Sequence, residues 1–340
     1  MHVLRLALAV SLLFGCDAPH FVPDDAGPRL TGVEPPPRTT RPDGPDEPPR
    51  ILILRDVRIV NDGHRGWDLD ARCTLPPTSP TGTWEHECAP TSASGEHVVD
   101  LEGCRDDAWA TEVAGAFGPL GAQLELALAT SMNDGVGPLM VRVSGWDGGA
   151  DDPSVLVEIV PVAFGVPSGG VRGDLLAWDG SDAFHPFAAF VEADGRAVLR
   201  DEEAYVSDGV LVARLLEDPV FPFRARDRSM TLRLGEAMLT LTFLEGGGAT
   251  DAVLTGRWPI DDALAELDHE GLCAGDPLRR AAEIRIRDSA DVRERSRGGA
   301  GMTAPCEALS ISLGFTPAAG LWGDVLEPDT ELPTPCAPAP

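Results

Sequence analysis

Short apolar runs rich in β-branched residues recur along this 340-residue chain and constrain its fold more than any other feature. Residues 51–60 form the first run, bounded by prolines and by Asn61-Asp62-Gly63. Runs of this length that end at turn residues are typical of β-strands. Similar runs lie at residues 139–144, 154–163, 187–192, 205–215, 229–234, 237–244, 252–258 and 308–315. Regularly spaced short strands predict a mainly β domain of the β-sandwich or jelly-roll type. Two alternating runs flank Gly235-Glu236, which predicts a hairpin there.

One stretch, residues 106–133, departs from the strand pattern and predicts a helical insertion. Its large apolar residues, from Trp109 to Leu128, recur every three or four positions, as on one face of a helix. Gly118-Pro119 divides the stretch, so we expect one or two helices. Asp276 before Pro277 is a helix-start signal, although the following Ile284-Arg285-Ile286 has strand character.

The charge and residue composition exclude several classes of function. All 27 basic residues are arginine, against 55 acidic residues, so the net charge is −28. Such a chain is a poor ligand for phosphate backbones, and we expect no nucleic-acid partner. A chain without lysine cannot form a Schiff base or carry a P-loop lysine. The sequence has no Gly-x-Ser-x-Gly, His-Glu-x-x-His or Gly-x-Gly-x-x-Gly motif, so we expect no enzyme and predict no catalytic residue.

The N-terminus has the pattern of an export signal. Residues 1–15 contain Arg5 and an apolar run at residues 6–14, which is too short to span a bilayer. The segment Leu13-Phe14-Gly15-Cys16 resembles the lipobox at which bacterial lipoproteins are cut and acylated. The resemblance implies fatty acyl chains such as palmitate on Cys16, and a stable membrane anchor. The alternative is an ordinary signal peptide cut elsewhere, with Cys16 in a disulfide.

The composition also predicts the domain boundaries. Residues 16–50 are rich in proline and charge and nearly free of large apolar residues, so we expect a disordered tether. Residues 51–326 form the β-rich globular domain, and residues 327–340 form a proline-rich tail. This order predicts a cell-envelope lipoprotein that is anchored in a membrane and faces the periplasm or the cell surface.

Cys16 aside, six cysteines remain: Cys73, Cys88, Cys104, Cys273, Cys306 and Cys336. An even number in an exported chain predicts three disulfides, for which fifteen pairings are compatible with the sequence. Spacing favours Cys73 with Cys88 and Cys273 with Cys306, and elimination then leaves Cys104 with Cys336.

Two acidic motifs are candidates for a metal site. Asp68 and Asp70 place two carboxylates on one side of an extended segment, and Asp106 and Asp107 follow in a second segment. Calcium takes six to eight oxygen ligands, so convergence of the four aspartates would favour a calcium ion, the one cofactor we consider. Nearby Cys73 and Cys104 could hold the two segments close. The alternative is that these aspartates cap a helix and stabilise a turn.

Several motifs resemble those of uncharacterised lipoproteins of myxobacteria, over most of residues 51–320. They are Trp67-Asp68-Leu69-Asp70, residues 103–107, residues 204–209, Gly256-Arg257-Trp258, and residues 306–310 with Gly314-Phe315. The resemblance implies a cell-envelope lipoprotein and no particular activity.

The sequence therefore favours a non-catalytic, tethered binding or structural module. Its partner besides the membrane would be an envelope polysaccharide or a protein. Residues 279–297 hold seven arginines against four acids and could receive an acidic polysaccharide or a lipid headgroup, or form a solvated face. Trp67, Trp146 and Trp178 could stack on sugar rings or plug the core. The alternative function is an exported hydrolase that cleaves polysaccharide through paired carboxylates.

Overall fold

The computed structural model describes most of the chain beyond the export signal. The described residues are 32–40, 44–60, 65–75, 87–92, 94–117, 119–165, 176–215, 218–224, 229–244, 246–296, 303–327 and 336. Cys16, the predicted lipidation site, lies outside them, as does most of the predicted tail.

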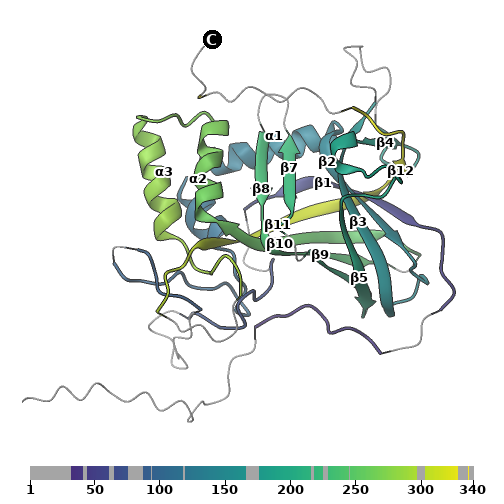
Figure 1. The fold of residues 1–340 in the computed structure, drawn as a ribbon, viewed down its shortest axis with the longest axis horizontal. Coiled ribbons are helices and arrows are strands. Elements are labelled where there is room, and N and C mark those ends of the chain that lie inside the picture. The colour runs from purple at the N-terminus through teal and green to yellow at the C-terminus, as the bar shows by residue number, and fades with distance from the viewer. Residues whose placement is uncertain are drawn as a thin grey trace, which may run out of the picture. The chain divides into compact units, whose positions relative to one another are not determined.

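Eight antiparallel strands form a closed β-barrel (Figure 1). Around the barrel their order is β3 (Asp152–Phe164), β2 (Val136–Ser144), β1 (Arg50–Arg58), β11 (Ala308–Ala319), β10 (Ala249–Pro259), β9 (Gly235–Phe243), β6 (Val210–Leu215) and β5 (Leu199–Ser207). The barrel closes because β5 pairs back with β3, from Val206 opposite Asp152 to Leu199 opposite Ile159. The mainly β class is therefore as predicted, but the predicted β-sandwich or jelly roll is wrong.

This correction has a physical reason. In a sandwich and in a barrel alike, every second residue of a strand faces the core, so alternation does not separate the two. Strands β3 and β11 are 13 and 12 residues long, and bulges interrupt the pairing of β3 with β5 and of β10 with β9. Bulges bend and twist strands, which lets one sheet curl until its edges meet. The closing pair joins strands that are not consecutive, so no local pattern records it.

The barrel interior is the main hydrophobic core. Leu54, Leu139, Val157, Leu241 and Leu313 are buried there, one from each of five strands. Helix α1 (Pro119–Asn133) and the two-stranded ribbon of β7 (Val220–Arg224) and β8 (Ser229–Arg233) add side chains to the same core. Because β8 pairs with β7 while β9 pairs with β10 and β6, the predicted hairpin around Gly235-Glu236 is wrong.

The helical insertion at residues 106–133 and the helix that starts at Asp276 lie where the sequence predicts them. A π-helical turn, η1 (Trp109–Ala114), and α1 occupy the predicted insertion. Helices α2 (Ile260–His269) and α3 (Pro277–Asp288) stand side by side in Figure 1. Asp276 caps α3 by accepting a hydrogen bond from the Leu278 amide at 2.7 Å, so its strand-like isoleucines belong to a helix. In the part of the chain that the structure describes, every helix is too short or too polar to cross a bilayer.

Short elements cover part of the outer wall of the barrel. Strand β4 (Ala183–Pro186) pairs with β3, and β12 (Leu321–Trp322) pairs with β4. Residues 187–192, predicted as a strand, instead contain the 3-10 turn η2 (Ala188–Phe190). A second apolar cluster fills the space beneath these elements.

The second half of the predicted tether lies on the domain. The Val33 amide donates to the Gly103 carbonyl at 2.8 Å, and the Asp68 amide donates to the Val33 carbonyl at 3.0 Å. Further on, the Tyr205 hydroxyl donates to the Pro36 carbonyl at 2.8 Å. Residues 32–40 therefore form a strap that bridges the two aspartate-bearing segments.

Candidate functional site

Three disulfides are formed, Cys73–Cys104, Cys88–Cys306 and Cys273–Cys336, which confirms the predicted number. The pairings favoured by spacing are all wrong. Cys88 reaches Cys306 across 218 residues because its loop runs beside residue 305: Ala89 and Pro305 form a β-bridge, and the Cys306 amide donates to the Ala89 carbonyl. The fold, not proximity in sequence, decides the pairing. Three disulfides indicate an oxidising, extracytoplasmic environment.

Three of the four predicted aspartates come together. One carboxylate oxygen from each of Asp68, Asp70 and Asp106 lies within 4.8 Å of the other two. Two oxygens on opposite sides of a calcium ion are about 4.8 Å apart, since each Ca–O distance is about 2.4 Å. The Cys73–Cys104 disulfide joins the two contributing loops to each other directly. The three carboxylates are therefore spaced so that one ion could contact all of them.

Backbone amides hold these carboxylates in place. The Arg72 amide donates to Asp70 Oδ1 at 2.9 Å and to Asp68 Oδ1 at 3.2 Å, and the Leu69 amide donates to Asp106 Oδ2 at 2.6 Å. The strap crosses Asp68 closely: a Cβ at Gly32 would lie 1.9 Å from Asp68 Oδ2. Only glycine allows the strap to pass there, so the strap packs directly on this cluster.

The fourth aspartate, Asp107, has a different role. Its Oδ1 accepts hydrogen bonds from the Ala110 amide at 3.2 Å and the Ser312 amide at 3.3 Å. Asp107 therefore anchors the first turn of η1 to strand β11 and is not part of the three-aspartate cluster. For this residue the capping interpretation describes the structure better than the metal interpretation.

Two further acids lie near the cluster, and sequence analysis missed both. Asp100 accepts from the Thr74 amide at 2.6 Å, and Asp291 accepts from the Ser310 amide at 2.8 Å. Both carboxylates act electrostatically on Asp106. Asp100 is close in sequence to Cys104, which is a weak signal. Asp291 arrives from a distant segment, and nothing in its local sequence marks it.

Burial shifts the titration of this whole group of acids. It raises the pKa of Asp70 to about 7, and the charges of Asp68 and Glu87 add to the shift. Burial also raises the pKa of Asp100 to about 8 and places that of Asp106 well above its usual range. Near neutral pH, burial and mutual repulsion disfavour the ionised form of these carboxyl groups. A bound cation would offset that repulsion and favour ionisation.

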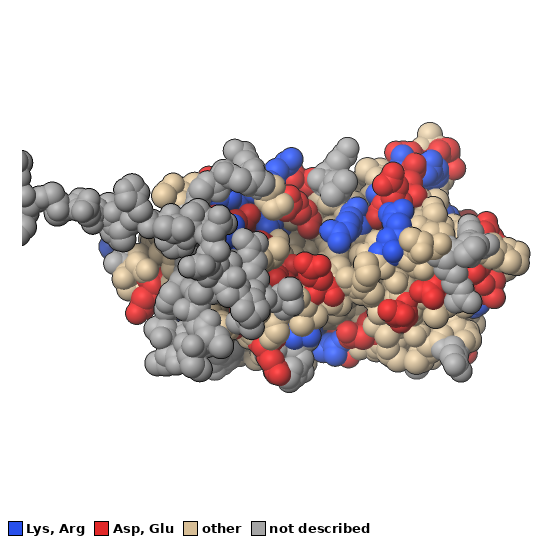
Figure 2. Space-filling view, turned by 90° about the horizontal axis from the view of Figure 1, so that it is seen from below, with Lys and Arg blue, Asp and Glu red and all other residues tan. Residues whose placement is uncertain are grey.

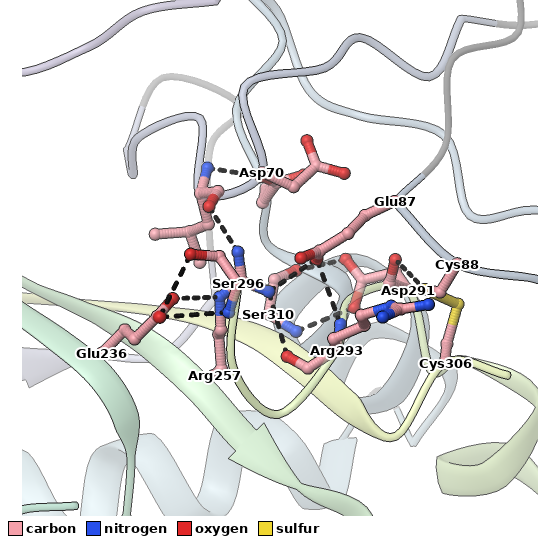
Figure 3. Close-up of polar contacts among 12 residues, drawn as sticks. Asp70, Glu87, Cys88, Glu236, Arg257, Asp291, Arg293, Ser296, Cys306 and Ser310 are labelled. Atoms are coloured by element: carbon pink, nitrogen blue, oxygen red, sulfur yellow. Dashed lines mark hydrogen bonds and ion pairs between the residues drawn. A yellow bond between two sulfur atoms is a disulfide. The ribbon is translucent and has the colours of Figure 1, made fainter. Parts of the chain in front are cut away.

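Arg257 connects the cluster to the barrel. Its side chain comes from β10 and is 1% exposed. In the sequence, a charged residue within the apolar run of β10 was the available sign of a special role for Arg257. Nη1 donates to Glu87 at 2.6 Å, Nη2 donates to the Leu69 carbonyl at 2.5 Å, and Nε pairs with Glu236 at 3.1 Å. Figure 3 shows Arg257 between these two glutamates. The guanidinium thus fixes the aspartate loop. Its positive charge also opposes part of the rise that burial causes in the pKa of Asp70.

The arginine-rich stretch pairs with nearby acids in the structure. Arg279 forms ion pairs with Asp268 and Glu283, and Arg285 pairs with Glu112. Figure 2 shows basic and acidic side chains side by side on one face of the molecule. These contacts match the interpretation of the stretch as a solvated face that neutralises neighbouring acids.

Two of the three singled-out tryptophans pack within the domain. Trp146 is buried and stacks on Phe243 with ring centroids 4.1 Å apart. Trp178 packs against Phe184 at 5.4 Å. Trp67 lies on the outer wall of the barrel, where it packs against the buried cluster of Tyr205, Val212 and Met238 and also lines a cavity.

Comparisons of the chain with protein-family models, with curated proteins and with solved structures found no match. Function is therefore inferred from the geometry and chemistry of these residues.

Proposed function

We propose that the protein is a non-catalytic, lipid-anchored module of a bacterial cell envelope that binds one calcium ion between Asp68, Asp70 and Asp106. The convergence of these three carboxylates within 4.8 Å carries the proposal for the ion. The lipobox-like segment at Cys16 and the extracytoplasmic environment indicated by the disulfides support the anchored location.

Calcium suits the site better than magnesium. The ligands are carboxylate oxygens on irregular loops, and calcium accepts flexible geometry with backbone carbonyls and water completing its shell. Magnesium demands near-ideal octahedral geometry at shorter distances and gives up its water reluctantly. The ion would join the loop of Asp68 and Asp70 to the loop of Asp106, and its charge would offset the repulsion among the buried acids.

Thermal unfolding tests the ion site. Calcium at one hundred times its dissociation constant should stabilise the folded domain by about 2.7 kcal/mol, and a chelator should reverse the shift in melting temperature. Asp261→Asn, which changes an exposed acid on α2, is the matched control and should keep the full shift. An unchanged melting temperature at millimolar calcium would refute the proposed site.

Replacement of Cys16 tests the anchor. The Cys16→Ser variant should leave the membrane fraction or be sorted wrongly, because it has no sulfur to acylate. Intact mass of the mature wild-type chain should show the added acyl groups. An unmodified thiol at Cys16 would contradict the anchored location and leave the calcium result unaffected.

A further inference from the structure

A second candidate site lies on the outer wall of the barrel, beside the ion cluster: its lining residues Trp67 and Arg105 directly precede Asp68 and Asp106. It is a cavity of about 440 Å³ over strands β6, β9 and β10. The lining residues that matter here are Arg58, Arg65, Arg105, Trp67, Thr240 and Thr242. Asp251 is the one acidic residue among the described residues that line it.

The fold brings these side chains together from separate segments. Thr240 pairs with Val253, and Val253 pairs with Gly314, so these positions share the outer face of β9, β10 and β11. A Cβ at Gly314 would lie 2.4 Å from the Arg65 Nε, so the absence of a side chain there lets Arg65 lie against the wall. Arg58 comes from the end of β1 and Arg105 from the second aspartate loop. The cavity is therefore built by residues distant in sequence.

Three guanidinium groups around one cavity are unusual in a chain with a net charge of −28. Arg58 Nη2 donates to Asp251 at 2.6 Å, but both side chains are more than 40% exposed, so this pair is weak. Arg105 Nη1 donates to the Glu102 carbonyl. A guanidinium has five N–H donors, so Arg58 and Arg105 keep donors for a ligand. Among the described lining residues, three arginines against Asp251 give the wall a net positive charge, and charges beyond about 8 Å are screened at physiological salt.

The remaining lining residues suit a sugar. Trp67 adds a flat apolar surface, and its Nε1 donates to Thr240 Oγ1 at 3.3 Å, which fixes the indole at the cavity. Thr240 is buried and its hydroxyl also donates to the Val253 carbonyl, whereas Thr242 is exposed and its hydroxyl can exchange hydrogen bonds with sugar hydroxyls. We propose that this cavity binds a carboxylated sugar unit of an acidic polysaccharide. Arg58 and Arg105 would pair with the carboxylate and Trp67 would contact the ring.

Calorimetric titration tests the proposal, with trigalacturonic acid as the probe and maltotriose and inorganic phosphate as comparisons. The acidic trisaccharide should bind at least about tenfold more tightly than either. Arg58→Gln and Arg105→Gln should each weaken it about tenfold, because each removes a charge-assisted contact. Arg196→Gln, in an exposed ion pair with Glu202 away from the cavity, is the control and should leave binding unchanged. Circular dichroism melts verify that each variant folds.

Three results would overturn the proposal. If maltotriose bound as tightly as the acidic trisaccharide, the arginines would not recognise the carboxylate. If phosphate bound as tightly, the cavity would be a general anion site with no preference for sugar. Unaltered affinity in both arginine variants would place the ligand elsewhere. The titration is run in chelator and again in calcium: binding that persists in chelator supports a site separate from the ion. Binding that requires calcium and ignores the arginine variants would instead indicate bridging through the ion, against this proposal.

Discussion

At Asp70, burial and neighbouring negative charge raise the carboxyl pKa to about 7, so its ionised form opposes folding when no cation is bound. We predict that Asp70→Asn at pH 8 raises the melting temperature of the chelator-treated domain and abolishes the response to calcium. Asparagine can still accept the Arg72 hydrogen bond but supplies no charge. A gain of 1 kcal/mol corresponds to about 2–4 °C in a domain of 150–250 residues. A variant that is less stable in chelator yet still stabilised by calcium would contradict this role.

Arg257 is a buried charge that stabilises the fold, in contrast to Asp70, because it has partners on three sides. Its loss would leave Glu87 with little compensation for burial and break the contact to the Leu69 carbonyl. We predict that Arg257→Met costs about 3–5 kcal/mol in denaturant-induced unfolding. The exposed pair of Arg196 and Glu202 is the comparison, and Arg196→Gln should cost less than about 1 kcal/mol. Similar losses in the two variants would argue against the role of Arg257 as the link between loop and barrel.

Among the larger elements, the Cys73–Cys104 cross-link joins the two aspartate loops across 31 residues. Its removal with Cys73→Ala and Cys104→Ala should cost about 3–4 kcal/mol of folding stability in the chain-entropy model. It should also weaken calcium binding, because the ion must then bring together two loops that have more conformational entropy to lose. Removal of Cys273–Cys336, which lies outside the cluster, should cost stability without changing calcium affinity. Equal calcium affinities in the two double variants would show that the cross-link does not organise the site.

Local patterns account for most of these elements and for little of their arrangement. The insertion of η1 and α1 follows from apolar spacing, and α3 follows from Asp276 and Pro277. Local patterns do not predict which elements pair. Strand β5 pairs with β3 only because the sheet closes into a barrel, and Cys88 bonds to Cys306 only because the fold brings them together. These contacts depend on the curvature of a whole sheet. Curvature comes from bulges that leave no clear signature in a single run of sequence.

For the whole molecule, the buried acids predict a stability that falls as pH rises. A carboxyl group whose folded pKa is raised stabilises the folded state below its unfolded pKa, near 4, and that contribution is lost as pH passes the folded value. For Asp291, Asp70 and Asp100 the folded values are about 6, 7 and 8. The chelator-treated domain should therefore melt at progressively lower temperature between pH 5 and pH 8. Calcium should reduce this fall, and a flat profile in chelator would contradict the shared burial of these acids.

The candidate site was only partly predictable for the same reason that the pairings were not. Asp68, Asp70 and Asp106 stand in short acidic motifs near cysteines, which local reasoning can find. Asp107 stands in the same motif but accepts a hydrogen bond from the Ala110 amide of η1 and does not join the cluster. The positions of nearby backbone amides, which the local sequence does not reveal, decide this difference. Asp100 and Asp291 join the group only through the tertiary fold.

The most direct test of the calcium site compares two adjacent aspartates that the structure separates. Calorimetric titration of calcium into the chelator-stripped domain should give one ion per chain. Asp106→Asn should abolish binding because its carboxylate belongs to the cluster, whereas Asp107→Asn should preserve it because asparagine can still accept the Ala110 hydrogen bond. Absence of binding in the wild-type domain, or equal loss in the two variants, would contradict the account.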